Sequence, residues 1–207
     1  MPELEFLVGR NVKIENLFRP VDDVVGLAKL ILYVVILGRD TGINKGIFRE
    51  AVTIQMSWPG APTVYYADEA GQVGWTDPDD RRTYPWGHED QSLISLHRDL
   101  ISLRRDLPVL KDGSLKQLLA EYGRIAYARF DDDTRCIVAV NNTAGWTDFH
   151  LYARDAGALE GEAFFRRVQT SEEGHETAPD EICKVSDGFL AFDLPPFSSV
   201  ILCNKAE

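Results

Sequence analysis

Ionisable side chains cluster between Asp68 and Arg82. Asp77 is followed by Pro78 and then by Arg81. A carboxylate accepts hydrogen bonds from hydroxyl groups, and a planar guanidinium fork beside it donates them. Asp77 and Arg81 therefore form a candidate binding site for a sugar. An Asp-Pro turn held by a local ion pair explains the same residues about equally well, so both interpretations stay open.

The adjacent carboxylates Asp68 and Glu69 come directly after the β-rich run 63–66. Catalytic groups of parallel barrels lie at that end of a strand, which makes this pair a candidate. Neighbouring residues of a strand point to opposite faces, however, so the two carboxyl groups cannot act together on one bond of a substrate. We therefore expect them to fix the loop through backbone N–H groups and nearby arginines rather than to catalyse.

The elements around these residues follow the order of one unit of a parallel α/β barrel. A helical period runs over 44–58, and a buried strand is expected over 63–66. A second amphipathic helix is predicted over 88–107. Between them, Trp75 and Trp86 could offer flat faces to sugar rings, although packing is the more common role of a large aromatic residue near a barrel rim.

A family resemblance is carried by the stretch from Pro59 to Trp86. Its pattern PGAPTVYYADEAG…DPDDRR…PW resembles the eighth barrel strand and following loop of the α-amylase family of glycoside hydrolases (family 13). Within that family it is most similar to the neopullulanase, cyclomaltodextrinase and maltogenic amylase branch, whose members carry an Asp-Pro-x-x-Arg segment here. Turn, strand, acidic pair and DPxxRR recur together in this order, which makes the match specific. Ala67 departs from the pattern, since most relatives have glycine there.

The resemblance implies retaining hydrolysis or transfer at α-glucosidic bonds, which needs two carboxyl groups about 5 to 5.5 Å apart. In the family, catalytic carboxylates follow strands four, five and seven, and the first two would lie upstream of this chain. The third normally follows a His, whereas the nearest counterpart here is Arg39-Asp40. No catalytic residue is therefore assigned. In the neopullulanase-like branch, the residues that match Asp77 and Arg81 contact a glucose unit on the non-reducing side.

The match to the family barrel covers roughly residues 41–107, and residues 1–40 do not match. We predict an α+β chain: a partial (β/α) barrel with one strand and two to three helices over 1–107, followed by an antiparallel β-sandwich domain over 108–207. The expected function is that of a C-terminal fragment of an α-amylase-family glycosidase, acting on α-glucans or maltooligosaccharides and inactive alone. A non-catalytic glycan-binding or partner-binding module is the alternative, and a structural remnant without a ligand is a third possibility.

From Leu110 onwards the hydrophobic period changes from helical to alternating. Short alternating segments separated by turns such as Asp187-Gly188 indicate an antiparallel sandwich. The stretch 170–180 is acidic, lacks apolar periodicity and is predicted to be a solvated loop. The predicted strands are 115–121, 124–130, 136–141, 148–152, 163–168, 181–185, 189–193 and 198–203.

The N-terminal segment holds an apolar run over 24–37, interrupted by Lys29. A membrane span needs roughly 20 such residues. A buried helix is therefore predicted, with a strand as the alternative because the run ends in β-branched residues. The strand at 63–66 would have a parallel neighbour on each side in a complete barrel. At most one partner could come from this N-terminal segment, so unpaired backbone groups favour a homo-oligomer or association with a missing barrel half.

Composition excludes several function classes. The net charge of -11 argues against nucleic acid or an anionic membrane surface as the partner. The odd, widely spaced cysteines Cys136, Cys183 and Cys203 are typical of a reduced, cytoplasmic protein, with Cys136 and Cys203 as small apolar residues in strands. No His or Cys pair has metal-ligand spacing, so neither a metal nor another cofactor is expected.

Overall fold

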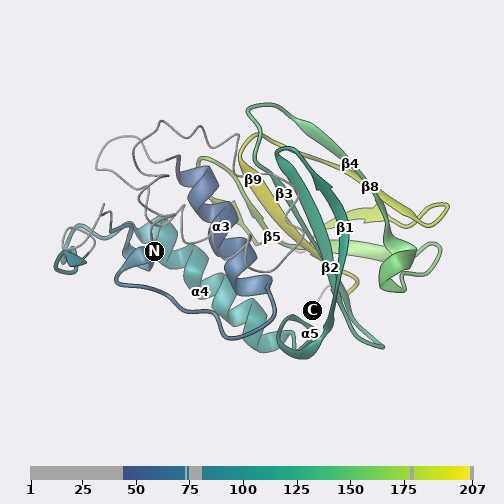
Figure 1. Cartoon of the computed structure of the whole chain (residues 1–207), viewed down its shortest axis with the longest axis horizontal. Helices are drawn as coiled ribbons and strands as arrows, with labels where there is room; N and C mark the ends of the chain where they lie inside the picture. Colours follow the sequence, from purple (N-terminus) through teal and green to yellow (C-terminus); the bar gives the residue numbers. More distant parts are fainter. Residues whose placement is uncertain (1–43, 73, 75–80, 178–179, 206–207) are drawn as a thin grey trace, which may run out of the picture.

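The computed structural model describes residues 44–72, 74, 81–177 and 180–205. They form three layers (Figure 1). Helices α3 (Lys45–Ser57) and α4 (Gln91–Asp106) cover one face of a large antiparallel sheet. Strands β4 (Thr147–Tyr152) and β8 (Phe189–Leu194) form a small second sheet on the other face. The predicted α+β class, with helices followed by an antiparallel sandwich, is confirmed.

Helix α3 confirms the helix predicted over 44–58. The Asn44 side chain caps it, because Oδ1 accepts from the backbone N–H groups of Gly46 at 2.8 Å and Ile47 at 3.3 Å. Gly46 also allows a close approach, since an added Cβ would lie 2.5 Å from the carbonyl oxygen of Phe197. The start of α3 is thereby fixed against the loop before the last strand.

Helix α4 confirms the second predicted helix but begins at Gln91 rather than at residue 88. Its start is set by Asp90, whose Oδ1 accepts from the N–H groups of Ser92 at 3.0 Å and Leu93 at 3.2 Å. The apolar stripe of the helix is buried against α3 and the sheet; it consists of Leu93, Leu96, Leu100 and Leu103.

The chain after α4 forms the one-turn helix α5 (Val109–Asp112) and then the strands of both sheets. Every predicted strand is confirmed, with ends within two residues of the structure. Besides β4 and β8 the strands are β1 (Ser114–Glu121), β2 (Arg124–Phe130), β3 (Arg135–Asn141), β5 (Ala163–Thr170), β6 (His175–Glu176), β7 (Glu181–Lys184) and β9 (Ser198–Cys203).

The prediction of a solvated loop over 170–180 is wrong in its first half, where β5 continues to Thr170 and pairs with β6. His175 in β6 accounts for the difference, because its Nε2 lies 2.7 Å from Asp99 Oδ2 on α4. A polar tertiary contact therefore orders a segment that has no apolar period.

The large sheet has the strand order β1-β2-β3-β9-β5-β6, and β7 also pairs with β5. All of these pairs are antiparallel. Strand alternation gives the sheet two apolar faces. In β3, Cys136 and Val138 face the helices, whereas Ile137 and Ala139 face β4 and β8. The helices thus share a core with the sheet, and the boundary predicted after residue 107 crosses a packed interface. Independent folding of 108–207 stays a prediction.

The cysteine prediction is wrong for two of the three residues. Cys136 and Cys203 lie directly opposite each other on β3 and β9 and form a disulfide, with a Cα–Cα distance of 4.2 Å. Antiparallel pairing brings them together although 67 residues separate them in sequence. Cys183 on β7 is not part of this disulfide.

The single barrel strand expected over 63–66 does not form, and these residues have no regular secondary structure. A strand needs hydrogen-bonded neighbours, and no described strand lies beside this segment to supply them. The apolar run 24–37, from which one neighbour was expected, lies outside the described residues.

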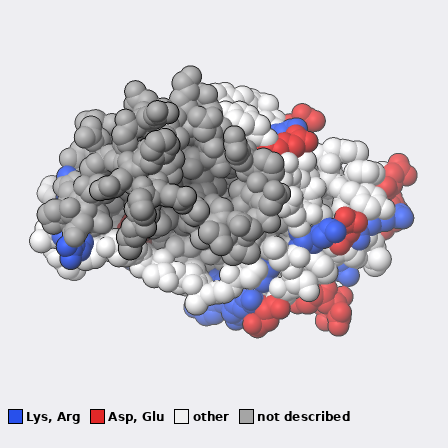
Figure 2. Space-filling model, in the orientation of Figure 1, with Lys and Arg blue, Asp and Glu red and all other residues white. Residues whose placement is uncertain are grey.

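No helix in the described part of the chain is long and apolar enough to cross a membrane. On the face shown in Figure 2, basic and acidic side chains of the described residues lie close together along the lower and right-hand edges. Along these edges the two signs are interspersed, and further basic side chains lie at the left-hand end.

Candidate functional site

The candidate site is the segment between α3 and α4, residues 58–90, whose two ends are fixed by the helices. Asp90 joins the parts: its Oδ2 accepts from Lys45 Nζ at 2.6 Å, and its N–H donates to the carbonyl oxygen of Ala70 at 2.9 Å. Because the side chain of Asp90 also caps α4, this one residue links the first turns of both helices to the loop.

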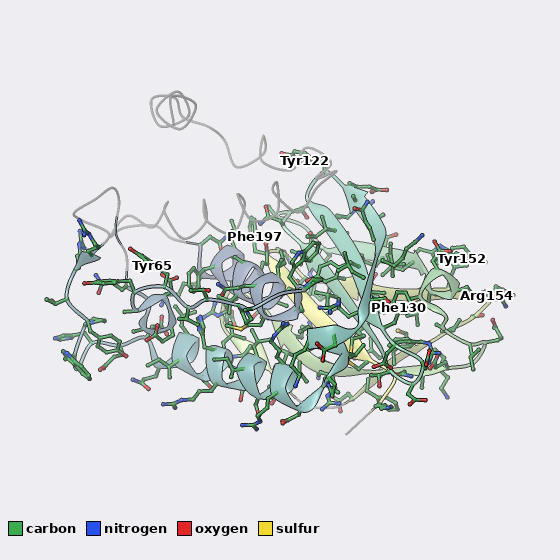
Figure 3. All side chains as sticks on the ribbon, turned by 60° about the horizontal axis from the view of Figure 1, so that its bottom comes forward. Tyr65, Tyr122, Phe130, Tyr152, Arg154 and Phe197 are labelled. Carbon is green, nitrogen blue, oxygen red and sulfur yellow. A yellow bond between two sulfur atoms is a disulfide. The ribbon has the colours of Figure 1, made fainter. Side chains whose placement is uncertain are left out.

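The first part of the segment lies along α3 with its side chains exposed. Gln55 Nε2 on the helix donates to the carbonyl oxygen of Thr63 at 2.6 Å. Tyr65 and Tyr66 are each 47% exposed, and their ring centroids lie 5.7 Å apart. Figure 3 shows Tyr65 at the helical end of the molecule, at the opposite end from Tyr152.

A tight turn follows, and it uses left-handed backbone conformations. The φ angles are 39° at Tyr66 and 69° at Ala67. A side chain with a Cβ costs roughly 1–2 kcal/mol in this region, whereas glycine adopts it freely. This cost explains why the position of Ala67 favours glycine.

Replacement of Ala67 by glycine is expected to raise the free energy of unfolding by up to about 1 kcal/mol, because the relief of strain exceeds the entropy that glycine adds to the unfolded chain. Urea unfolding of the two proteins measures the change. Ala61→Gly is the matched control, since Ala61 is exposed and does not have a positive φ. An equal loss of stability in both variants would contradict the expectation.

Asp68 and Glu69 lie in the short 3-10 helix η2 (Asp68–Ala70) rather than at the end of a strand. The strand-based argument about their faces therefore does not apply. Burial raises the pKa of Asp68 to about 6; a backbone hydrogen bond with Tyr65 opposes this rise, and the charge of Glu69 adds to it. Because the folded pKa lies above the unfolded value of about 4, protonation of Asp68 favours the folded loop. That contribution is lost as the pH rises from about 4 to about 6.

Of the predicted sugar-binding pair, Asp77 lies outside the described residues. Arg81 is exposed, and its backbone carbonyl oxygen accepts from Tyr66 Oη at 3.3 Å. The later part of the loop is thereby tied to the exposed tyrosines. Sugar contact by Asp77 and Arg81 stays a prediction.

Exposed aromatic rings extend the candidate site beyond the predicted pair. The rings of Tyr84 and Trp86 lie 4.6 Å apart at 50°, and Trp86 is 80% exposed. Packing, the more common role for such a residue, is therefore wrong for Trp86, while Trp75 lies outside the described residues. The position of Trp86 between proline and glycine was the available signal, because a turn residue has few neighbours to pack against.

The described part of the chain contains no candidate metal site. No group of three or more His, Cys, Asp or Glu side chains there could hold an ion.

Comparisons with known proteins find amylopullulanases and a neopullulanase among the relatives of the chain. It is 39% identical over 165 residues to an amylopullulanase of Thermoanaerobacterium saccharolyticum, a match that covers 74% of this chain and 12% of the relative. It is 32% identical over 167 residues to neopullulanase 2 of Thermoactinomyces vulgaris, covering 79% of this chain and 26% of the relative. No family model matches the chain.

Among solved structures, an Anoxybacillus α-amylase matches with a TM-score of 0.60 and 26% identity. The match covers 75% of this chain and 31% of the amylase. The chain thus spans less than a third of the length of each of these relatives. The activity of a whole relative does not pass to it by similarity alone.

Proposed function

Because the chain belongs to the α-amylase family of glycoside hydrolases and corresponds to the C-terminal part of its members, we propose that it serves α-glucan recognition as the C-terminal part of such a glycosidase and does not cleave glucans alone. One observation carries the proposal. Helices α3 and α4 are packed on the sandwich and hold an exposed loop with Arg81 and aromatic rings between them.

The chemistry of this loop suits a neutral sugar. Tyr65, Tyr66 and Trp86 expose flat apolar faces with polar edges. The guanidinium of Arg81 donates to hydroxyl oxygens, and Asp77 is the proposed acceptor beside it. Neopullulanase and amylopullulanase relatives are named for α-glucan substrates, which supports α-glucans or maltooligosaccharides as the ligand class.

The proposed lack of hydrolysis follows from the carboxylates. A retaining mechanism needs two carboxyl groups about 5 to 5.5 Å apart on either side of the bond. Asp68 and Glu69 are neighbours within η2, where both serve one short turn of the loop. No catalytic role is assigned to either residue.

The proposed partner of the exposed segment is the remainder of an α-amylase-type barrel, in the same or in a separate polypeptide. Val64, Tyr65 and Tyr66 are between 38% and 47% exposed, as expected for a strand sequence that lacks its neighbours. Self-association through the same segment is the alternative. These exposed groups also favour the second candidate function, a non-catalytic module that binds glycans or a partner.

Location in the cytoplasm stays a prediction. The disulfide between Cys136 and Cys203 bears on it, because disulfides persist mainly in oxidising compartments. We also propose that neither nucleic acids nor membranes are partners, because the chain carries a net charge of -11.

The test begins with the purified chain and starch, pullulan and β-cyclodextrin. We expect no release of reducing ends from any of them. Turnover that persists through further purification and disappears in Asp40→Asn would overturn the proposed lack of hydrolysis.

The same protein is then titrated with maltoheptaose by calorimetry. Arg81→Ala is expected to weaken binding by the loop at least about tenfold, since a hydrogen bond from a charged donor contributes about 1.5–3 kcal/mol. Arg105→Ala is the matched control, because Arg105 is exposed on α4 and pairs with Asp106. Equal affinity of both variants and the unchanged chain would contradict recognition by Arg81.

A further inference from the structure

The outer face of the β4–β8 sheet has an unusual composition for a solvent-facing surface. The two strands pair so that Asp148 lies opposite Asp193, His150 opposite Ala191 and Tyr152 opposite Phe189. These side chains share one face, since Phe149, Leu151 and Leu190 alternate with them and are buried in the sandwich. The outer face of an antiparallel sheet is ordinarily polar. Here the two opposed carboxylates lie at one end of the face, and the aromatic rings follow along it towards the other end.

The rings are arranged as a platform. His150 stacks on Phe189 with centroids 4.3 Å apart and planes at 7°, and Tyr152 lies 5.0 Å from Phe189 at 56°. Tyr152 is 44% exposed, and Trp146, just before β4, is 72% exposed. In Figure 3, Tyr152 and Arg154 lie at the end of the molecule away from the helices and from Tyr65. The platform is therefore separate from the loop that holds Arg81.

Its chemistry distinguishes between classes of ligand. Protein interfaces are enriched in aromatic residues but depleted in Asp at their core. This face has a carboxylate from each strand and no Leu, Ile or Val. Carboxylates only accept hydrogen bonds, so the ligand must donate them, and hydroxyl groups do so without charge. Asp148, Asp193 and the net charge of -11 disfavour an anion.

We propose that the outer face of β4 and β8 is a second α-glucan-binding surface, on which sugar rings stack against Trp146 and Tyr152 while Asp148 and Asp193 accept from their hydroxyls. The choice of an α-glucan rests on the proposed function. From residue 146 to 152 an extended strand spans about 20 Å. The surface therefore suits an oligosaccharide of several units, held beside the candidate site rather than in it.

The test is calorimetric titration with maltoheptaose in the Arg81→Ala background, where recognition by the loop is weakened. Trp146→Ala and Tyr152→Ala are each expected to weaken the remaining binding by roughly three- to tenfold, as loss of an aromatic contact does. Trp146→Phe and Tyr152→Phe keep a flat ring and are expected to retain most of it. Ile101→Ala, at an exposed apolar position on α4, is the matched control.

The outcomes separate the two sites. If binding is lost completely in Arg81→Ala, the proposal of a second surface is overturned and recognition by the loop is supported. Binding that is unchanged in Arg81→Ala but lost in Tyr152→Ala supports the platform and contradicts recognition by the loop. If the unchanged chain does not bind maltoheptaose, the platform is overturned, whereas the lack of hydrolysis is decided by its own assay. Thermal unfolding of each variant checks that these exposed substitutions leave the fold intact.

Discussion

Replacement of Arg129 by methionine is expected to lower the free energy of unfolding by at least about 3 kcal/mol. Arg129 on β2 is completely buried beneath the helices. Its Nη1 donates to the carbonyl oxygens of Ser57 and Leu110, each at 2.7 Å, and its Nη2 donates to that of Gly113 at 2.9 Å. One guanidinium thus connects the ends of α3 and α5 to the sheet.

The size of this effect follows from the groups that Arg129 satisfies. The last carbonyl groups of a helix have no partner within the helix and carry its negative dipole end. A buried acceptor left without a donor costs about 1–3 kcal/mol. Methionine fills much of the same volume but donates nothing, so the loss is electrostatic rather than steric.

Arg104 modifies the expectation, because it lies close to Arg129. Its Nη1 donates to the carbonyl oxygens of Met56, Trp58 and Leu110, the last of which it shares with Arg129. Burial lowers the pKa of Arg129, and the charge of Arg104 lowers it further. Removal of Arg129 relieves that repulsion, which makes the loss smaller than the sum of the broken hydrogen bonds.

Urea unfolding followed by tryptophan fluorescence measures the change. Arg129→Lys is expected to fall between the two proteins, because a single ammonium group cannot reach every carbonyl that the fork reaches. Arg105→Ala, which removes an exposed arginine, is the control for the loss of charge. A cost below about 1 kcal/mol for Arg129→Met, the range of an ordinary exposed ion pair, would contradict the structural role.

These arginines show where prediction from the sequence ends. Alternation and helical spacing locate the strands and both helices, because period and burial are local properties. The same alternation offers no reason to bury Arg129, whose partners are carbonyl groups from distant parts of the chain. The strand expected over 63–66 fails for a similar reason: its composition suits a sheet, but pairing depends on neighbours that no local pattern contains.

The candidate site divides in the same way. Arg81 and the acidic pair at 68–69 were predictable from residue types and order. The sequence also held a signal of the positive φ at Ala67, because most relatives have glycine at this position and glycine favours such angles. The raised pKa of Asp68 depends on burial in a turn, and the exposure of Trp86 depends on the path of the loop. The platform on β4 and β8 needed the pairing register, since residues on two strands share a face only when that register is known.

Replacement of both Cys136 and Cys203 by serine is expected to lower the free energy of unfolding by about 4 kcal/mol, from the chain entropy of a loop of this length. The bond closes a sequence separation of 67 residues. Both cysteines are fully buried in the core between the helices and the sheet, next to Val138 and Ile201. Two serine hydroxyls in that core add the cost of burying polar groups.

Two measurements test the disulfide without relying on the variant alone. Thiol titration of the denatured, unreduced protein is expected to find a single reactive group, that of Cys183. Unfolding of the unchanged protein with and without a thiol reductant is expected to show the same large loss as the double variant. Cys183→Ser is the control and is expected to respond to the reductant as the unchanged chain does.

Three reactive thiols, together with unfolding that is insensitive to reductant, would contradict the disulfide. They would support the reduced state that the cysteine spacing predicts. The result also bears on the compartment in which the protein works. Disulfides form and persist mainly in oxidising compartments and are rare where glutathione keeps thiols reduced. The disulfide joins β3 to β9 at the centre of the large sheet, which supports both proposed glucan surfaces. We therefore expect the free energy of unfolding of this sheet to be highest under oxidising conditions.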